Sequence, residues 1–212
     1  MTSRGKKRRS RRFLPAAVAL GLVALTAAIW SIDALPPPAE WFVDDSRYRE
    51  EIAAAAGRHG LDPDLVRALI FKESRFDPRA RGGAGEIGLM QVLPSGAAAE
   101  WSRVLKRPCL SERELFDVRT NLEVGCWYLA RALRRWRDYA AGTELALAQY
   151  NAGESRARAW APSDRRGGVL KRITVKSTRD YVMKVMKRYR LYAARRGERG
   201  SSAVSGSVTG LR

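Results

Sequence analysis

The chain has 212 residues, enough for one ordinary domain with appendages but not for two full domains. It carries 40 Lys and Arg against 22 Asp and Glu, so its formal net charge is +18. Such a charge favours an anionic polymer or an anionic surface as partner, without choosing between them. The single histidine and the lack of a Cys-x-x-Cys pair exclude a histidine-rich metal site and a zinc site built on such pairs. We therefore expect neither a metal nor a cofactor.

A long uncharged run near the N-terminus predicts a membrane anchor. Residues 1–12 are strongly basic and contain no acid, and Phe13 to Ile32 contain no charge. As a helix this run would span about 30 Å, the hydrocarbon thickness of a bilayer. We predict a basic cytoplasmic segment at 1–12 and a single transmembrane helix at 13–34, with the remainder on the outer, periplasmic side of the inner membrane. A cleaved signal peptide is the alternative, but the run is longer than its usual apolar region of about 7–15 residues.

The exported part divides by composition. Three consecutive prolines predict a stiff linker at 35–46, and a Gly- and Ser-rich end predicts a disordered tail at 196–212. Residues 47–195 are then the folded domain. We find no internal repeat in the sequence.

Helical spacing dominates this domain from its beginning. Tyr48 and Ile52 open a helix that Gly57 and Gly60 are expected to end. Asp62 followed by Pro63 predicts the cap and first residue of a second helix. The inner side of that helix is predicted to hold Leu65, Leu69 and Ile70.

Three more helices are expected farther along the chain. Thr120 is the expected cap of a long helix, and Thr178 is the expected cap of the last one. Between them, residues 144–151 predict a short helix that stops near Gly153. The apolar stripe of the long helix would comprise Leu122, Cys126, Leu129, Leu133 and Trp136, and that of the last helix Val182, Val185, Met186 and Tyr189. No alternating strand pattern of useful length occurs, so the predicted fold class is all-α.

One glycine motif and one carboxylate are candidates for chemistry. The stretch from Gly83 to Gly88 matches the G-x-G-x-x-G fingerprint of dinucleotide-binding folds, but the polar residues before it cannot form the buried strand that this fingerprint requires. Glu73 follows the apolar stretch that ends with Ile70 and Phe71. A partly desolvated carboxylate there would have a raised pKa and could donate a proton. On spacing alone, a surface glutamate at a helix end is the favoured interpretation of Glu73.

Four ordered segments resemble the lytic transglycosylases of the Slt type, glycoside hydrolase family 23. Residues 73–95 contain the Glu-Ser pair, a glycine-rich loop and Gly-Leu-Met-Gln. Residues 114–133 resemble the family's next helix, 146–153 its Ala-Tyr-Asn-Ala-Gly motif, and 178–189 its final tyrosine motif. The resemblance extends over about residues 47–192, and four motifs in order are far more specific than any one. It implies a lysozyme-like fold of the goose-type/Slt kind.

The resemblance also implies an activity and roles for residues. The family cleaves the β-1,4 bond of peptidoglycan between N-acetylmuramic acid and N-acetylglucosamine, using one carboxylate and forming a 1,6-anhydro end. Glu73 would be that acid and base. Ser74 would hydrogen-bond near the substrate or near Glu73, and Gln91 and Asn151 would hold sugar amides. Met90 and Tyr150 would form an apolar floor, and Tyr181 would orient Glu73 through its hydroxyl. Each of these residues also has a purely structural reading, as a cap, a backbone partner or a core side chain.

Two departures from the family pattern are visible. Gln149 stands where the family commonly has a small residue, and we expect it to alter the wall of the cleft. Glu86 adds a second carboxylate in the glycine loop, which leaves a hydrolytic muramidase open as an alternative.

The partner and the state of the cysteines are less closely determined by the sequence. A non-catalytic membrane protein that binds cell wall or DNA would suit the charge, but it leaves the four motifs unexplained, so peptidoglycan and not nucleic acid is the expected partner. Attachment to a cell-envelope machine is compatible with a short anchored chain. Cys109 and Cys126 could form a disulfide outside the cytoplasm, or Cys126 could remain a buried free thiol.

Overall fold

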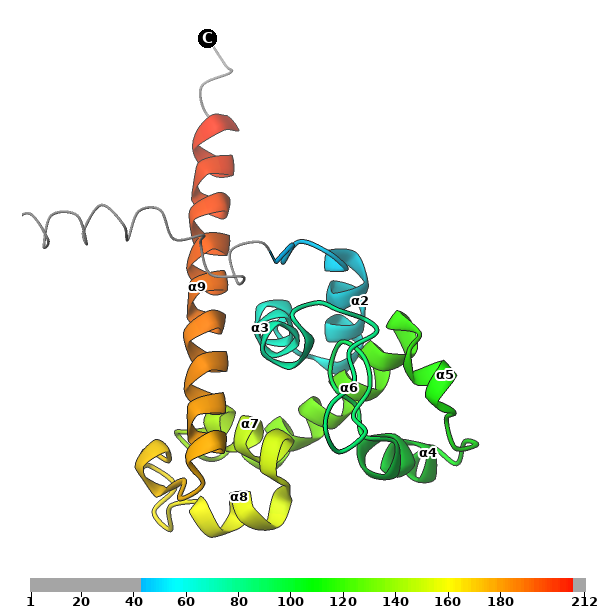
Figure 1. Ribbon diagram of the computed structural model, residues 1–212. Helices are drawn as coiled ribbons and strands as arrows, with labels where there is room; N and C mark the ends of the chain where they lie inside the picture. The colour runs from blue at the N-terminus through cyan, green and yellow to red at the C-terminus, as the bar shows by residue number, and fades with distance from the viewer. Residues whose placement is uncertain (1–42, 208–212) are drawn as a thin grey trace, which may run out of the picture. The chain divides into compact units, whose positions relative to one another are not determined.

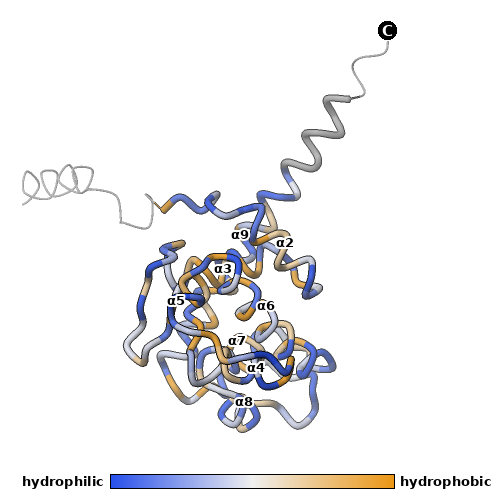
Figure 2. The backbone as a smooth tube through the Cα atoms, turned by 90° about the vertical axis from the view of Figure 1, so that its right-hand side faces the viewer, coloured by the Kyte–Doolittle hydropathy of each residue, from blue (hydrophilic) through white to orange (hydrophobic). Residues whose placement is uncertain are grey.

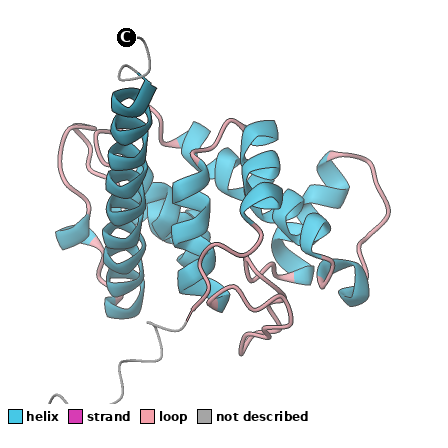
Figure 3. Ribbon diagram, turned by 90° about the horizontal axis from the view of Figure 1, so that it is seen from above, coloured by secondary structure: helices cyan, strands magenta, loops and turns pink. Residues whose placement is uncertain are grey.

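The computed structural model describes the backbone of residues 43–207 and the side chains of residues 43–198. The predicted cytoplasmic segment, the predicted anchor at 13–34 and most of the predicted linker lie outside these residues. Within them, no helix combines the length and the apolar character needed to cross a bilayer. The described part consists of helices and loops, as Figure 3 shows, and contains isolated bridges between Arg81, Ile87 and Val92 but no strand. The prediction of an all-α fold is thus confirmed for this part.

The helices follow one another with short connections, and the longest connection holds the glycine loop (Figure 1). In chain order they are α2 (Arg49–His59), α3 (Pro63–Ser74), the π-helical turn η2 (Pro94–Ala98), α4 (Ala99–Val104), α5 (Glu112–Leu115), α6 (Val118–Arg135), α7 (Gly142–Ala152), α8 (Glu154–Trp160), the 3-10 turn η3 (Leu170–Arg172) and α9 (Lys176–Ser207).

The start of α3 follows the sequence prediction. The carboxylate of Asp62 accepts the backbone N–H of Asp64 at 2.9 Å, and Pro63 is the first helical residue. The preceding helix ends at Gly60, whose φ of 66° suits a residue without a side chain. The expectation that Gly57 helps to end it is wrong, because Gly57 lies within α2.

Two predicted caps are displaced by a few residues. Helix α6 begins at Val118, and its cap is Asp117, whose carboxylate accepts the N–H of Thr120 at 2.9 Å. A carboxylate three residues upstream therefore takes the capping position that we expected Thr120 to hold. Helix α9 begins at Lys176, so Thr178 is a buried residue of its first turn instead of its cap.

A single apolar core joins the helices. Helix α3 packs against α9, α6 packs against α2 and α7, and α7 also packs against α9. Figure 2 shows apolar and hydrophilic stretches alternating along the helices that face the viewer, as expected of helices with one buried face. The apolar stripes predicted for α3, α6 and α9 are buried, except that Leu133, Met186 and Tyr189 are only partly buried. The largest fully buried side chains include Leu69, Ile70, Leu122, Leu129, Leu145 and Leu147.

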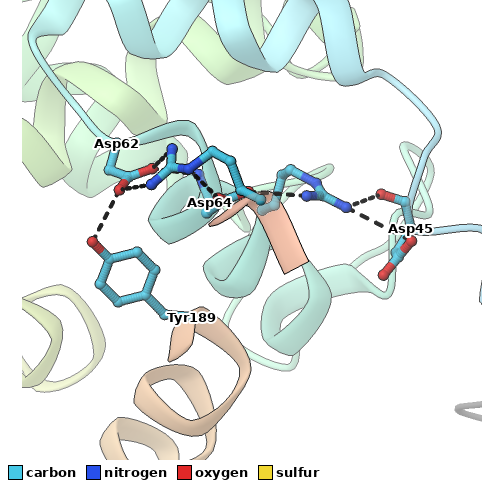
Figure 4. Close-up of polar contacts among 6 residues, drawn as sticks. Asp45, Asp62, Asp64 and Tyr189 are labelled. Carbon is cyan, nitrogen blue, oxygen red and sulfur yellow. Dashed lines mark hydrogen bonds and ion pairs between the residues drawn. The ribbon is translucent and has the colours of Figure 1, made fainter. Parts of the chain in front are cut away.

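A cluster of charged side chains fixes α9 alongside the start of α3. Asp62 accepts hydrogen bonds from the hydroxyl of Tyr189 at 3.0 Å and from both terminal nitrogens of Arg196 at 2.9 Å (Figure 4). Arg67 pairs with Asp64 at 3.0 Å. Because α9 also carries Tyr181 and α3 also carries Glu73, this cluster helps to set the positions of the two side chains. Helix α9 continues to Ser207, past the predicted domain end at 195, and the domain boundaries remain predictions.

Candidate active site

A cleft of about 360 Å³ opens where the end of α3, the glycine loop, η2, α6 and α7 meet. Its volume lies in the range of small-ligand sites in proteins. Four of its lining residues are glycines, which contribute only backbone to the wall. The lining residues are Glu73, Gly82, Gly83, Glu86, Gln91, Val92, Leu93, Gly96, Ala97, Tyr128, Tyr150, Asn151 and Gly153.

Glu73 reaches the cleft from the last turn of α3. The helix stops abruptly after Ser74, because Arg75 and Phe76 both adopt positive φ angles, of 53° and 66°. Such angles are unfavourable for residues with a side chain, and they persist only where surrounding contacts hold them. The burial of the Phe76 ring supplies such a contact. The chain therefore turns sharply just beyond Glu73.

The pKa of the Glu73 carboxyl group is raised into the neutral range. Its removal from bulk water raises its pKa to about 7, against an ordinary value of 4.5. The hydroxyl of Tyr181 donates to Oε1 of Glu73 at 2.5 Å and, like the charge of nearby Lys72, opposes this rise, whereas the negative charge of Glu86 adds to it. Glu73 is consequently about half protonated near neutral pH, which is where a general acid works best.

Two tyrosines that interact with Glu73 are neutral, of which Tyr181 is buried and Tyr150 is partly buried. Burial raises the pKa of both Tyr150 and Tyr181 well above the usual tyrosine value, and the charge of Glu73 reinforces the effect. The hydroxyl of Tyr150 donates to the carbonyl oxygen of Met90 at 2.8 Å, and its ring meets that of Tyr128 edge to face at 5.5 Å. The rings of Tyr128 and Tyr150 line the cleft. They present flat apolar surface of the kind that a sugar ring can cover.

The glycine loop is held by one buried amide. Asn121 of α6 donates to the carbonyl oxygens of Ile87 and Leu115 and accepts the N–H of Met90, so all of its hydrogen-bonding groups contact backbone. Gly88 has a φ of 76°, and a Cβ there would come within 2.4 Å of the Asn121 amide. Only glycine fits at this position without displacing the amide.

The residues predicted as a site fall into three groups. Glu73, Gln91, Tyr150 and Asn151 line the cleft, and the side chain of Asn151 is exposed there. Tyr181 contacts Glu73 directly, as the resemblance implied, without lining the cleft itself. Their roles toward a substrate remain predictions.

Ser74 and Met90 form the third group, which supports the site from outside the cleft. The hydroxyl of Ser74 donates to the carbonyl oxygen of Leu89 at 2.8 Å, so it ties the end of α3 to the glycine loop. Met90 is fully buried, and its sulfur lies 3.9 Å from that of Cys126. Both positions agree with the structural readings of these residues.

The structure corrects what the sequence predicted for the cleft wall. Gln149 does not alter this wall, because it is buried and accepts the indole N–H of Trp136 at 2.8 Å. Neither Tyr128 nor the apolar wall of Leu93 and Ala97 was predicted from the sequence. The only sequence signal for Tyr128 is its position beside Leu129 in the family motif at residues 114–133.

The structure also describes both cysteines. Cys109 is an exposed free thiol and Cys126 is a buried one, so the disulfide alternative is wrong. No group of three or more acidic, His or Cys side chains in these residues is arranged to hold a metal ion.

Comparison with known proteins gives a consistent answer. Residues 50–171 match the family model described as the transglycosylase SLT domain. The chain is 34% identical over 84 residues to membrane-bound lytic murein transglycosylase E of Buchnera aphidicola, covering 39% of this chain and 38% of that protein. It is 38% identical over 115 residues to membrane-bound lytic murein transglycosylase F of Desulfosudis oleivorans, covering 53% of this chain and 23% of that protein. The chain thus spans less than two fifths of the length of these two relatives.

Solved structures agree with this result. An inactive mutant of lytic transglycosylase Slt from Pseudomonas aeruginosa superimposes with a TM-score of 0.62 at 29% identity, covering 72% of this chain and 25% of that one. The 70 kDa soluble lytic transglycosylase of Escherichia coli gives a TM-score of 0.61 at 25% identity, covering 70% and 25%. The lysozyme-like Slt fold is therefore shared with these enzymes, and because the family model covers more than half of the sequence, the chain belongs to the transglycosylase SLT domain family.

Proposed function

We propose that the protein is a lytic transglycosylase that cleaves the β-1,4 bond between N-acetylmuramic acid and N-acetylglucosamine in peptidoglycan. The observation that carries this proposal is a single carboxyl group, Glu73, with a pKa of about 7 at the wall of an open cleft in an SLT domain. The family names of the relatives support the substrate class.

The first step is protonation of the leaving group. Tyr181 holds Oε1 of Glu73, which leaves Oε2 to face a glycosidic oxygen. Transfer of the proton of Glu73 to that oxygen lets the bond between C1 of the muramic acid and the bridging oxygen break. Because burial keeps Glu73 protonated up to about pH 7, the acid form is available under physiological conditions.

The second step returns the proton to Glu73. The C6 hydroxyl of the same muramic acid attacks C1, a new C1–O6 bond forms, and the hydroxyl proton passes to the carboxylate. The product is a 1,6-anhydro end, no water is consumed, and the enzyme recovers its starting state. An attack within one sugar ring needs no enzymatic nucleophile, because proximity replaces it. One carboxylate is thus sufficient.

Other cleft residues have suitable positions for the sugars. Tyr128 and Tyr150 offer aromatic surface, and the exposed amide of Asn151 can hydrogen-bond an acetamido group. We assign Gln91 to the same task through its carbonyl oxygen, because its amide nitrogen already donates to the carbonyl of Gly88 at 2.9 Å. Ser74 and Met90 are assigned a supporting role.

The membrane setting belongs to the same proposal. The apolar run at 13–34 would anchor the enzyme in the inner membrane and place residues 47–195 in the periplasm, beside the cell wall. Two relatives named membrane-bound are in keeping with this setting. The net charge of +18 would favour anionic wall and lipid surfaces, and attachment to a cell-envelope machine remains part of the proposal.

Hydrolysis is the second candidate, because Glu86 lines the same cleft. A muramidase that uses water generally needs a second carboxylate to activate it. The two reactions differ only in the acceptor that attacks C1. Both require Glu73 as the acid, whereas a protein that merely binds cell wall requires no acid at all.

Replacement of Glu73 tests the enzymatic proposal. The full chain in mild detergent should release soluble fragments from purified peptidoglycan, and the Glu73→Gln variant should lose about 10³-fold or more of this activity, as expected for removal of a general acid. The matched control is Glu112→Gln, which neutralises an exposed carboxylate of α5 that pairs with Arg81. Activity retained in Glu73→Gln would contradict the assignment.

A further inference from the structure

The glycine loop places two acceptor oxygens side by side at the cleft. A Cβ built on Gly82 would lie 2.3 Å from Oε2 of Glu86 and 2.7 Å from Oε1 of Gln91, so both oxygens converge over the Cα of Gly82. All three residues line the cleft. The missing side chain of Gly82 therefore leaves the space that the carboxylate of Glu86 occupies.

The loop itself orients this carboxylate. The N–H of Ala84 donates to Oε2 of Glu86 at 2.9 Å, and the N–H of Gly82 donates to the carbonyl of Glu86 at 2.9 Å. These bonds close a tight turn with the carboxylate on its inner side. Among the residues that the structure describes, no Lys or Arg forms an ion pair with Glu86, so its charge is not neutralised from within the cleft.

Gln91 adds a second acceptor and no donor. Its amide nitrogen donates to the carbonyl oxygens of Gly88 at 2.9 Å and Ala80 at 3.3 Å, which uses both of its N–H groups. The φ of 47° at Gln91 fixes the backbone in the conformation that permits these bonds. Two acceptors cannot hydrogen-bond each other, so a ligand that contacts both oxygens has to supply the donors.

We propose that Glu86 contacts the substrate and that, with Oε1 of Gln91, it recognises hydroxyl or amide N–H donors of the sugar bound beside Glu73. The inference rests on the proposed function for the identity of that sugar. It assigns Glu86 a part in substrate recognition and not in the activation of water, and it gives Gly82 a reason to lack a side chain. The negative charge of Glu86 also raises the pKa of Glu73 from a distance, whereas Tyr181 and Lys72 lower it.

Direct binding is the first test. In a Glu73→Gln background, which prevents turnover, binding of peptide-free glycan strands of alternating N-acetylglucosamine and N-acetylmuramic acid is measured by titration calorimetry. Adding Glu86→Gln should weaken binding several-fold and Glu86→Ala about tenfold, because loss of a hydrogen bond to a charged acceptor has that magnitude. Adding Glu112→Gln should leave the affinity unchanged.

Two glycine variants test the geometry without changing the charge. Gly82→Ala should weaken binding by displacing the carboxylate of Glu86, whereas a Cβ on the adjacent Gly83 meets no atom within 4 Å. The effect of Gly82→Ala should therefore exceed that of Gly83→Ala. Equal affinities for these two variants, or an unchanged affinity in Glu86→Ala, would overturn the inference.

Kinetics of the otherwise unaltered enzyme complete the test. Glu86→Gln should raise KM more than it lowers kcat, and it should move the alkaline limb of the pH profile to lower pH, because removing the charge of Glu86 lowers the pKa of Glu73. A loss of stability alone would move neither quantity. A different result would be products with ordinary reducing ends that the unaltered enzyme forms and the Glu86→Gln variant does not form. That result would show that Glu86 activates water and would contradict the inference.

The binding and cleavage results separate the two proposals. Glu86-dependent binding by a protein that cleaves nothing would contradict the proposed function and support the inference. If the protein forms anhydro products but its binding does not depend on Glu86, the proposed function is supported and the inference is contradicted. Absence of both binding and cleavage would contradict both.

Discussion

Glu73→Gln is expected to stabilise the folded protein at alkaline pH while it removes activity. The pKa of Glu73 is about 7 in the folded protein, against an ordinary value of 4.5. Because the folded-state pKa is the higher one, the contribution of this group is fully present below pH 4.5 and is lost as the pH rises toward 7. At about 1.4 kcal/mol for each pKa unit, the loss amounts to about 3 kcal/mol above neutrality.

The amide of the variant avoids this loss. Glutamine carries no charge at any of these pH values, and its carbonyl oxygen can still accept the hydroxyl of Tyr181. At pH 8 the variant should therefore unfold about 6–12 °C above the unaltered protein, given about 2–4 °C for each kcal/mol in a domain of this size. At pH 4 the two proteins should unfold at nearly the same temperature.

Thermal unfolding of the full chain, followed by circular dichroism from pH 4 to pH 8, measures this difference. Glu112→Gln serves as control, because the pKa of that exposed carboxyl group is lowered by Arg81 and its neutralisation should bring no gain at alkaline pH. A Glu73→Gln variant that unfolds at or below the temperature of the unaltered protein at pH 8 would refute the reasoning. It would mean that Glu73 is not desolvated in the folded state.

Individual contacts lead to three more predictions. Tyr181→Phe should lower kcat about tenfold and shift the alkaline limb of activity to higher pH, because the lost hydrogen bond opposes the raised pKa of Glu73; an unchanged pH profile would contradict this. Asn121→Ala should lower the free energy of unfolding in urea by about 2–4 kcal/mol, since it leaves buried backbone groups unpaired; a loss below about 1 kcal/mol would count against it. Iodoacetamide should modify Cys109 but not Cys126 in the folded protein, because burial raises the pKa of the Cys126 thiol to about 12; mass spectrometry showing two rapid additions would be the contrary result.

The sequence predicts the helices well where the signal is local. Asp62 and Pro63 mark the beginning of α3, because a cap and a first-turn proline act within a few residues. The caps of α6 and α9 were misplaced by two or three residues, since several polar residues lie near each start and tertiary contacts choose among them. The ion pairs of Asp62 with Arg196 join residues far apart in sequence, and no local pattern reveals them.

For the candidate site, too, the sequence predicts some features, and others depend on the three-dimensional structure. Glu73, Gln91, Tyr150 and Asn151 were identified through family motifs, and the fold brings them to one cleft. The motif letters alone could not separate residues facing the cleft from those behind it. Met90 and Ser74 belong to the same motifs but lie behind the cleft. Met90 is buried, and the hydroxyl of Ser74 donates to the carbonyl oxygen of Leu89 in the glycine loop. The place of Glu86 depends on the absence of a side chain at Gly82, which requires the loop geometry.

Mass spectrometry of the muropeptides that the full chain releases from purified peptidoglycan distinguishes the proposed reaction from hydrolysis. Cleavage by Glu73 alone, with attack by the C6 hydroxyl, predicts products that end in 1,6-anhydro-muramic acid, about 18 Da (one water) lighter than hydrolysed ones. These products should disappear in Glu73→Gln. Products that carry ordinary reducing ends from the start would contradict the proposed mechanism and make the protein a muramidase.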